Sequence, residues 1–292
     1  MTDTSKYHLQ KGTSADGPYD LLVTPESAGW GHSGLRILTL GPGQAHTLHT
    51  GDSEILVLPL TGSCTVTTDG RAFELAGRTG VFASATDFAY LPRESEALIS
   101  SADGGTYALP SARTERSSLS ARYGPKEDVP VELRGAGACS RQVNNYCLPG
   151  TFEAEQLLVC EVLTPGGNWS SYPPHKHDEA RPGEESELEE IYYFQVAGEG
   201  GFAYQRVYGT PERPIDVLAE VRSGDTVLIP HGWHGPSIAA PGYDLYYLNV
   251  MAGPGQERAW LICDDPAHGW VRGTWESQDV DDRLPFEGVT QR

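Results

Sequence analysis

Short apolar runs separated by Gly and Pro turns dominate the hydrophobic pattern of the chain. The clearest runs are residues 35–40, 54–62, 156–163, 202–208 and 243–250. They have the length and the Val, Ile, Leu and Tyr content of β-strands, whereas long helical periods are scarce. Asp69 and Gly70 sit between two further β-rich segments and are typical of a tight hairpin. The pattern therefore predicts an all-β protein.

The pattern also repeats, which predicts two similar β units in one chain. Each half carries a Glu eight residues before a Gly, and an Asp five residues before a Pro. The matching residues are Glu54 and Gly62, Asp87 and Pro92, then Glu190 and Gly198, Asp225 and Pro230. We expect one barrel plus a linker in residues 1–130, with the linker at 110–130, and a second barrel in residues 131–292. Each would be a small antiparallel jelly roll.

The second half contains residues suited to a metal. His175 and His177 are two apart, so in a strand their imidazoles point to the same face. A carboxylate, Glu189 or Glu190, comes from the next apolar run. A third imidazole comes from His231 or His234, in the turn that follows residues 224–230. An isolated H-x-H is more often a pair of packing histidines, but the three pieces occur in order on β-patterned segments.

This order of motifs resembles the metal-binding motifs of the cupin superfamily. The resemblance implies the ligands His175, His177, Glu190 and His234. Glu190 is preferred because it lies three residues before Tyr193, as in cupins. His234 is preferred because the turn needs residues between Gly232 and the next strand. Three imidazoles and one carboxylate suit one divalent transition metal, Zn, Mn, Fe or Ni, more than Ca or Mg.

The first half lacks this set, so we expect it to be metal-free. It has Arg93, Glu94, Ser95 and Glu96 where the second half has the histidine turn. Its own His46 and His49 are three apart, and on a strand they would face opposite ways. The acidic residues 179–190 between the H-x-H and the carboxylate are read as a solvated loop, with a lid over the metal as the alternative.

A narrower resemblance covers most of the chain. The segments that carry it are residues 77–78, 90–93, 173–178, 189–193, 201–208 and 241–253. They are similar to the 5-deoxy-glucuronate isomerase family of myo-inositol catabolism. That resemblance implies two cupin barrels in one chain, a bicupin. It also implies the aldose–ketose isomerisation of 5-deoxy-D-glucuronate to 2-deoxy-5-keto-D-gluconate, with a small sugar acid as substrate.

Such a reaction needs groups that move a proton and groups that hold a carboxylate. The candidates for the carboxylate clamp are Arg206 and Arg258, because Arg can bind a carboxylate through two parallel hydrogen bonds. Tyr193 is a candidate for substrate contact. The candidates for proton transfer and catalytic polar contacts are Gln205, Asp244 and Tyr247. The sequence gives no argument for which of them is the base.

Other activities fit the same ligands, since ligands alone do not choose a reaction. One alternative is the related uronate ketol-isomerase of pectin breakdown. An Fe-dependent cupin dioxygenase and a non-catalytic sugar- or metal-binding cupin are the others.

Composition limits the partners and the compartment. The chain of 292 residues has a formal net charge of −19, which argues against nucleic acid. Five cysteines without a C-x-x-C motif indicate reduced thiols in a cytoplasmic protein. Residues 1–7 are polar and no apolar run has membrane length, so neither a signal peptide nor a membrane span is expected. Homo-oligomers are compatible with this type of barrel. The tail from Ala252 is expected to cover the mouth of the second barrel.

Overall fold

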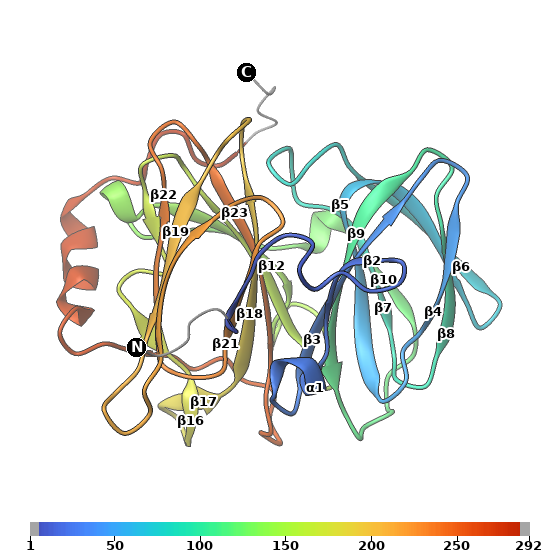
Figure 1. Cartoon of the computed structure of the whole chain (residues 1–292), viewed down its shortest axis with the longest axis horizontal. Coiled ribbons are helices and arrows are strands. Elements are labelled where there is room, and N and C mark those ends of the chain that lie inside the picture. The colour runs from blue at the N-terminus through green and yellow to red at the C-terminus, as the bar shows by residue number, and fades with distance from the viewer. Residues whose placement is uncertain (1–5, 287–292) are drawn as a thin grey trace.

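The structure, a computed structural model that describes residues 6–286, is built almost entirely of β-strands. Residues 1–5 of the polar N-terminal segment therefore lie outside the described residues. Figure 1 shows the strands of the first half of the chain at one end of the molecule and those of the second half at the other. The all-β prediction is confirmed.

The first half forms one nine-stranded antiparallel sheet. Its strands are β2 (Tyr19–Val23), β3 (Ser33–Leu40), β4 (Ala45–His49), β5 (Ser53–Thr68), β6 (Arg71–Arg78), β7 (Phe88–Leu91), β8 (Glu96–Ser100), β9 (Gly105–Arg113) and β10 (Arg122–Gly124). The hairpin between β5 and β6 turns at Asp69 and Gly70, both with positive φ, as the sequence predicts. The two apolar segments before that turn form one continuous strand, β5.

The second half forms two smaller sheets, of seven and six strands, with an apolar core between them. The seven-stranded sheet contains β1 (His8–Leu9), β11 (Val131–Arg134), β12 (Arg141–Cys147), β13 (Leu158–Thr164), β18 (Glu189–Val196), β21 (Thr226–Ile229) and β23 (Leu245–Ala252). The six-stranded sheet contains β14 (Trp169–Ser170), β15 (His175–Lys176), β19 (Ala203–Tyr208), β20 (Asp216–Val221), β22 (Trp233–Ala239) and β24 (Cys263–Asp264).

The remaining elements are short. The acidic segment after the H-x-H forms its own two-stranded hairpin, β16 (Asp178–Arg181) with β17 (Glu185–Glu187). The helices are α1 (Pro25–Ala28) and the 3-10 helices η1 (Lys126–Asp128), η2 (Gly137–Cys139) and η3 (Gly269–Ser277). Within residues 6–286, no helix has both the length and the apolar character that crossing a bilayer requires.

Two expectations about the chain's division need correction. The segment 110–130 is not a free linker, because residues 110–113 complete β9 and β10 pairs with β7. The Ser, Arg and Pro residues in that segment suggested a linker, but the β9 backbone pairs with β3 and β5 along its length. The N-terminal arm also crosses to the other half, where β1 pairs with β21.

Three apolar cores follow from strand alternation. One lies within the nine-stranded sheet and includes Val57, Val66 and Leu109. A second lies between the seven- and six-stranded sheets of the second half and includes Phe194 and Val207. The third lies between the two halves and takes residues from both. The two sheets of the second half thus enclose an interior, into which alternate side chains of β18 and β23 project.

Two carboxylates, the buried Glu54 and the partly buried Glu189, join the halves reciprocally and change how the two halves match. Glu54 on β5 accepts backbone N–H groups of Glu155, Gln156 and Leu157 at 2.6–2.8 Å, and the hydroxyl of Tyr90 at 2.8 Å. Glu189 on β18 accepts backbone N–H groups of residues 31–33 at 2.7–2.9 Å. Glu54 is therefore the counterpart of Glu189 rather than of Glu190, one residue away from the match that the sequence suggested.

We predict that Glu54→Gln lowers the free energy of unfolding by about 2 kcal/mol. The amide NH2 of the new Gln side chain would face backbone N–H groups that donate to the carboxylate in wild type. Hydrogen bonds to a charged group contribute about 1.5–3 kcal/mol each. Urea denaturation measures the change. Glu74→Gln on the exposed face of β6 is the matched control and should shift stability by less than about 0.5 kcal/mol. Equal stability of the two variants would contradict the inter-half role of Glu54.

Candidate metal centre

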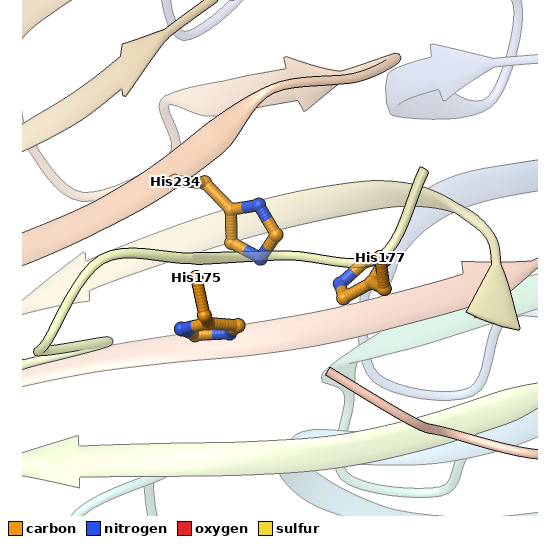
Figure 2. Close-up of side chains that lie close together, drawn as sticks. All are labelled: His175, His177 and His234. Carbon is orange, nitrogen blue, oxygen red and sulfur yellow. The ribbon is translucent and has the colours of Figure 1, made fainter. Parts of the chain in front are cut away.

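Three histidines meet inside the second half. His175 lies on β15, His177 follows that strand, and His234 lies on β22, directly opposite His175 in the strand register. Figure 2 shows the three imidazoles facing a common space. The ring centroids of His175 and His177 lie 4.4 and 4.7 Å from that of His234. One ligand atom from each residue lies within 4.8 Å of the others, and all three side chains are buried.

Local backbone contacts set the direction of two rings. The Nδ1 atoms of His175 and His234 face the carbonyl oxygens of Pro173 and Gly232 at 3.4 and 3.2 Å. A carbonyl partner at Nδ1 leaves Nε2 as the lone-pair nitrogen for a metal. Gly235, next to His234 within β22, permits a close approach of the Ser171 backbone: its φ is +100°, and a Cβ there would lie 1.7 Å from the Ser171 carbonyl oxygen.

Glu190 completes the cluster from β18. Its Oε2 lies 3.1 Å from Nε2 of both His177 and His234, while its buried Oε1 has no hydrogen-bond partner. Burial alone would raise the pKa of Glu190, but the two histidines lower it to about 2, so the group is a carboxylate at neutral pH. Glu189 points to the opposite face of the strand.

These residues fit a transition-metal ion chemically. Burial, together with the neighbouring His234 and His177, lowers the pKa of His175 well below its usual value, so its imidazole is neutral. The pKa of His177 is raised by Glu190 in spite of burial, and a bound cation would take the place of that proton. His234 Nε2 is buried and, although it lies 3.1 Å from Glu190 Oε2, makes no hydrogen bond. Nitrogen donors predominate, as zinc, manganese, iron and nickel sites favour.

Two other predicted residues lie in the same interior. Tyr247 on β23 donates its hydroxyl to Ser170 Oγ at 2.9 Å, and its ring stacks on Tyr192 with centroids 4.8 Å apart. The Tyr192 ring in turn contacts His234, and the centroids of these two rings lie 6.1 Å apart. Gln205 on β19 is fully buried, but its amide is engaged by Ser237 Oγ and the Arg206 carbonyl.

Four predicted residues do not reach the histidines. Arg206 lies on the other face of β19 from Gln205 and binds Asp216. Arg258 donates to backbone carbonyls, among them that of Leu157 at 2.9 Å. Asp244 Oδ1 accepts the backbone N–H of Gly166 at 2.8 Å. Asp244 precedes β23, at the end of that strand away from Glu190. Tyr193 belongs to the core between the halves, because residues three apart on a strand face opposite ways.

A cavity of about 160 Å³ beside His175 contains residues that the sequence reasoning missed. Its lining residues are Arg134, Arg141, His175, Trp260, Ile262 and Arg272. The tail expected to cover the barrel mouth supplies three of them, including Arg272 on η3. The sequence feature that could have revealed this cavity is Arg141, a charged residue on the same face of a strand as the core residue Val143.

A comparison with protein families shows which family the chain belongs to. A family model described as KduI/IolB matches residues 7–271. The chain belongs to the KduI/IolB family. Within it, the chain is 43% identical over 251 residues to 5-deoxy-glucuronate isomerase of Geobacillus thermodenitrificans, covering 85% of this chain and 89% of the relative. For the enzyme of that name in Bacillus subtilis strain 168, the identity is 38%, covering 85% and 91%.

Solved structures agree with this family membership. An IolB-like protein from Salmonella typhimurium LT2 superimposes with a TM-score of 0.84 at 33% identity, covering 91% of this chain and 98% of that one. Oxalate decarboxylase from Lactobacillus farciminis gives a TM-score of 0.58 at 14% identity, covering 83% and 82%. The second likeness shows a related β fold alone. The resemblance to the 5-deoxy-glucuronate isomerase family is thereby confirmed.

Proposed function

We propose that this KduI/IolB family member is a metal-dependent aldose–ketose isomerase that converts 5-deoxy-D-glucuronate to 2-deoxy-5-keto-D-gluconate. The observation that carries the proposal is the 43% identity, over 85% of the chain, to a relative named 5-deoxy-glucuronate isomerase. The buried cluster of His175, His177, His234 and Glu190 supplies a chemically suitable site. The relatives' name supports this substrate over an uronate of pectin breakdown, and supports an isomerase over a dioxygenase.

The reaction needs no second substrate. One hydrogen moves from C2 to the aldehyde carbon C1, and the proton of the C2 hydroxyl moves to the C1 oxygen. The aldehyde becomes an alcohol and C2 becomes the ketone, so atoms and electrons balance within the sugar. The difficulty is the negative charge that develops on the two neighbouring oxygens when the C2 hydrogen leaves as a proton.

We propose that His175, His177, Glu190 and His234 hold one divalent transition metal, Zn, Mn, Fe or Ni. Bound there, it would supply Lewis-acid polarisation of the substrate oxygens. The protein's own contribution is orientation and exclusion of water, since all four side chains are buried. Burial raises the pKa of Tyr247 to about 12, so its hydroxyl keeps its proton at neutral pH and is suited to donating a hydrogen bond. Tyr247 is the predicted catalytic residue that this interior best supports.

The finer architecture is part of the proposal. We propose two cupin barrels, with residues 1–130 metal-free and residues 131–292 carrying the site. A separate apolar core within each half supports this division, with the reservation that the β1 arm belongs with the second unit. We also propose that the protein acts in inositol catabolism, as the family resemblance implies, and that it is cytoplasmic, as its cysteine content favours. Homo-oligomers are compatible with this type of barrel.

Turnover with and without metal tests the function. Purified protein should convert 5-deoxy-glucuronate to the ketose, lose this activity after dialysis against a chelator, and regain it with one of the four metals. Metal analysis before and after dialysis gives the stoichiometry. The uronate substrate of the pectin-breakdown isomerase should turn over much more slowly, and no oxygen should be consumed. Fully metallated protein that forms no ketose from 5-deoxy-glucuronate would refute the isomerase.

A further inference from the structure

The cavity beside His175 gathers three guanidinium groups from separate elements. Arg134 lies on β11, Arg141 on β12 and Arg272 on η3. In a chain with a net charge of −19, such a concentration of cations needs a local reason. The cavity adjoins the candidate metal centre because His175 is part of its lining.

Two of these cations already have anionic partners. Arg134 binds both carboxylate oxygens of Glu132 at 2.7 and 2.8 Å, and Arg272 forms a similar two-point pair with Asp264. Within residues 6–286, no carboxylate forms an ion pair with Arg141, which instead donates Nη1 to the Cys139 carbonyl at 2.9 Å. The lining thus carries one net positive charge, located on Arg141.

The position of Arg141 is electrostatically unfavourable in the absence of an anion. Its side chain is buried, and it lies directly opposite Arg134 in the pairing of β11 with β12. Like charges opposite each other on neighbouring strands are destabilising, as is a buried charge without a partner. Burial lowers the pKa of Arg141 to about 10, with Arg134 and Arg272 adding to the effect, so it remains a cation at neutral pH.

The surrounding residues nevertheless hold this cation in place. The ring of Trp275 contacts the guanidinium groups of both Arg141 and Arg272, with centroid distances of 5.3 and 5.2 Å. Gly135, whose φ is +77°, leaves the space that Arg141 occupies, because a Cβ there would lie 2.6 Å from Nη1. In the cavity wall, Trp260 has a buried indole N–H with no hydrogen-bond partner. A cation and a neutral donor are therefore both available to a ligand.

We propose that this cavity is the subsite for the carboxylate group of the sugar acid, and that Arg141 determines specificity for acids over neutral sugars. The proposal rests on the proposed function. A carboxylate matches the single net charge and can accept two parallel N–H bonds from a guanidinium. A phosphate dianion would exceed that charge. Trp260 Nε1 offers a further donor. The arrangement assigns to Arg141 the role that the sequence predicted for Arg206 or Arg258.

Binding of a sugar acid that cannot be isomerised tests the subsite without turnover. D-gluconate has a carboxylate but no aldehyde or ketone, and D-glucitol is its neutral counterpart. Calorimetry on metal-loaded wild-type protein should show gluconate binding at least about 30-fold more tightly than glucitol. Arg141→Gln should abolish this preference and retain the metal. Arg206→Gln is the matched control. Arg206 lies on β19 in the same half, and its side chain binds Asp216 outside the cavity. This variant should retain the preference for gluconate.

Thermal stability separates a ligand-binding role from a structural one. Removing an unpaired buried cation should leave the melting temperature of Arg141→Gln equal to or above that of wild type, whereas a structural Arg would lower it on replacement. If Arg141→Gln fails to fold, Trp260→Phe decides, because it keeps the packing and removes the donor; we expect a roughly 5-fold loss of gluconate affinity. Unchanged gluconate affinity in folded Arg141→Gln, or in Trp260→Phe where Arg141→Gln does not fold, would overturn the proposal.

The subsite and the isomerase can fail separately. Gluconate binding that depends on Arg141, in protein that forms no ketose, would support the subsite and reject the proposed function. Ketose formation with the same KM in wild type and Arg141→Gln would support the function and reject the subsite. An Arg141→Gln variant with a KM raised about 30-fold or more for 5-deoxy-glucuronate and full metal content would support both.

Discussion

Glu190→Gln is expected to lower the turnover of 5-deoxy-glucuronate by a factor of about 10³. The carboxylate is the one anionic group of the cluster, with Oε2 3.1 Å from Nε2 of both His177 and His234. An amide in its place removes the charge that attracts a cation. A loss of about 4 kcal/mol of metal-dependent stabilisation corresponds to about three powers of ten in rate. Initial rates at saturating substrate, together with metal content by mass spectrometry, measure the effect.

Glu189→Gln is the matched control, since it changes the neighbouring residue on the same strand. Glu189 faces the other half of the molecule and accepts backbone N–H groups of Gly31, His32 and Ser33. Its replacement should cost about 2 kcal/mol of unfolding free energy while metal content stays the same. If Glu189→Gln lost the metal and Glu190→Gln kept both metal and activity, the ligand assignment would be wrong.

The parts of the site that lie on regular strands could be predicted from the sequence. Alternation puts His175 and His177 on one face, and the turn at Gly232 brings His234 opposite His175. The same rule, applied to Glu190, would have favoured Tyr192 over Tyr193 as the tyrosine of the interior. The cupin spacing pointed to Glu190, the carboxylate that lies beside the histidines, but a spacing of three cannot place both Glu190 and Tyr193 on one face of a strand.

Residues that reach the site from irregular or distant segments could not be predicted in this way. Arg272 lies on a 3-10 helix and Trp260 in a loop, so no period relates them to the H-x-H motif. Arg141 differs because it lies on a strand. Its position on the inner face of β12, where a charge is costly, was a readable signal. Arg206 was named for the chemistry of its guanidinium, but it neighbours Gln205 on a strand and therefore faces the opposite way.

The ion pair and hydrogen bonds that join the halves could not be predicted from the sequence either, because their partners are residues far apart in the chain. Arg78 on β6 forms an ion pair with Glu161 on β13, and both side chains are almost fully buried. Glu161 also accepts the hydroxyls of Tyr146 and Tyr246 at 3.0 and 2.9 Å. The Arg78 pKa is raised, because Glu161 outweighs the effect of burial. The contact links the nine-stranded sheet to the sheet that carries Glu190.

Arg78→Met is therefore expected to destabilise the protein by about 3–5 kcal/mol, since it leaves a buried carboxylate without its cation. For a chain of this size, that corresponds to a fall in melting temperature of about 10 °C. Differential scanning calorimetry measures it at fixed protein concentration and metal content. Arg222→Met is the control, because its pair with Glu220 is roughly half exposed and should contribute less than about 1 kcal/mol. A melting temperature within 2 °C of wild type for both variants would mean that the tyrosine hydroxyls satisfy Glu161 without Arg78, and that the ion pair adds nothing to the apolar packing and the Glu54 and Glu189 hydrogen bonds that join the two halves.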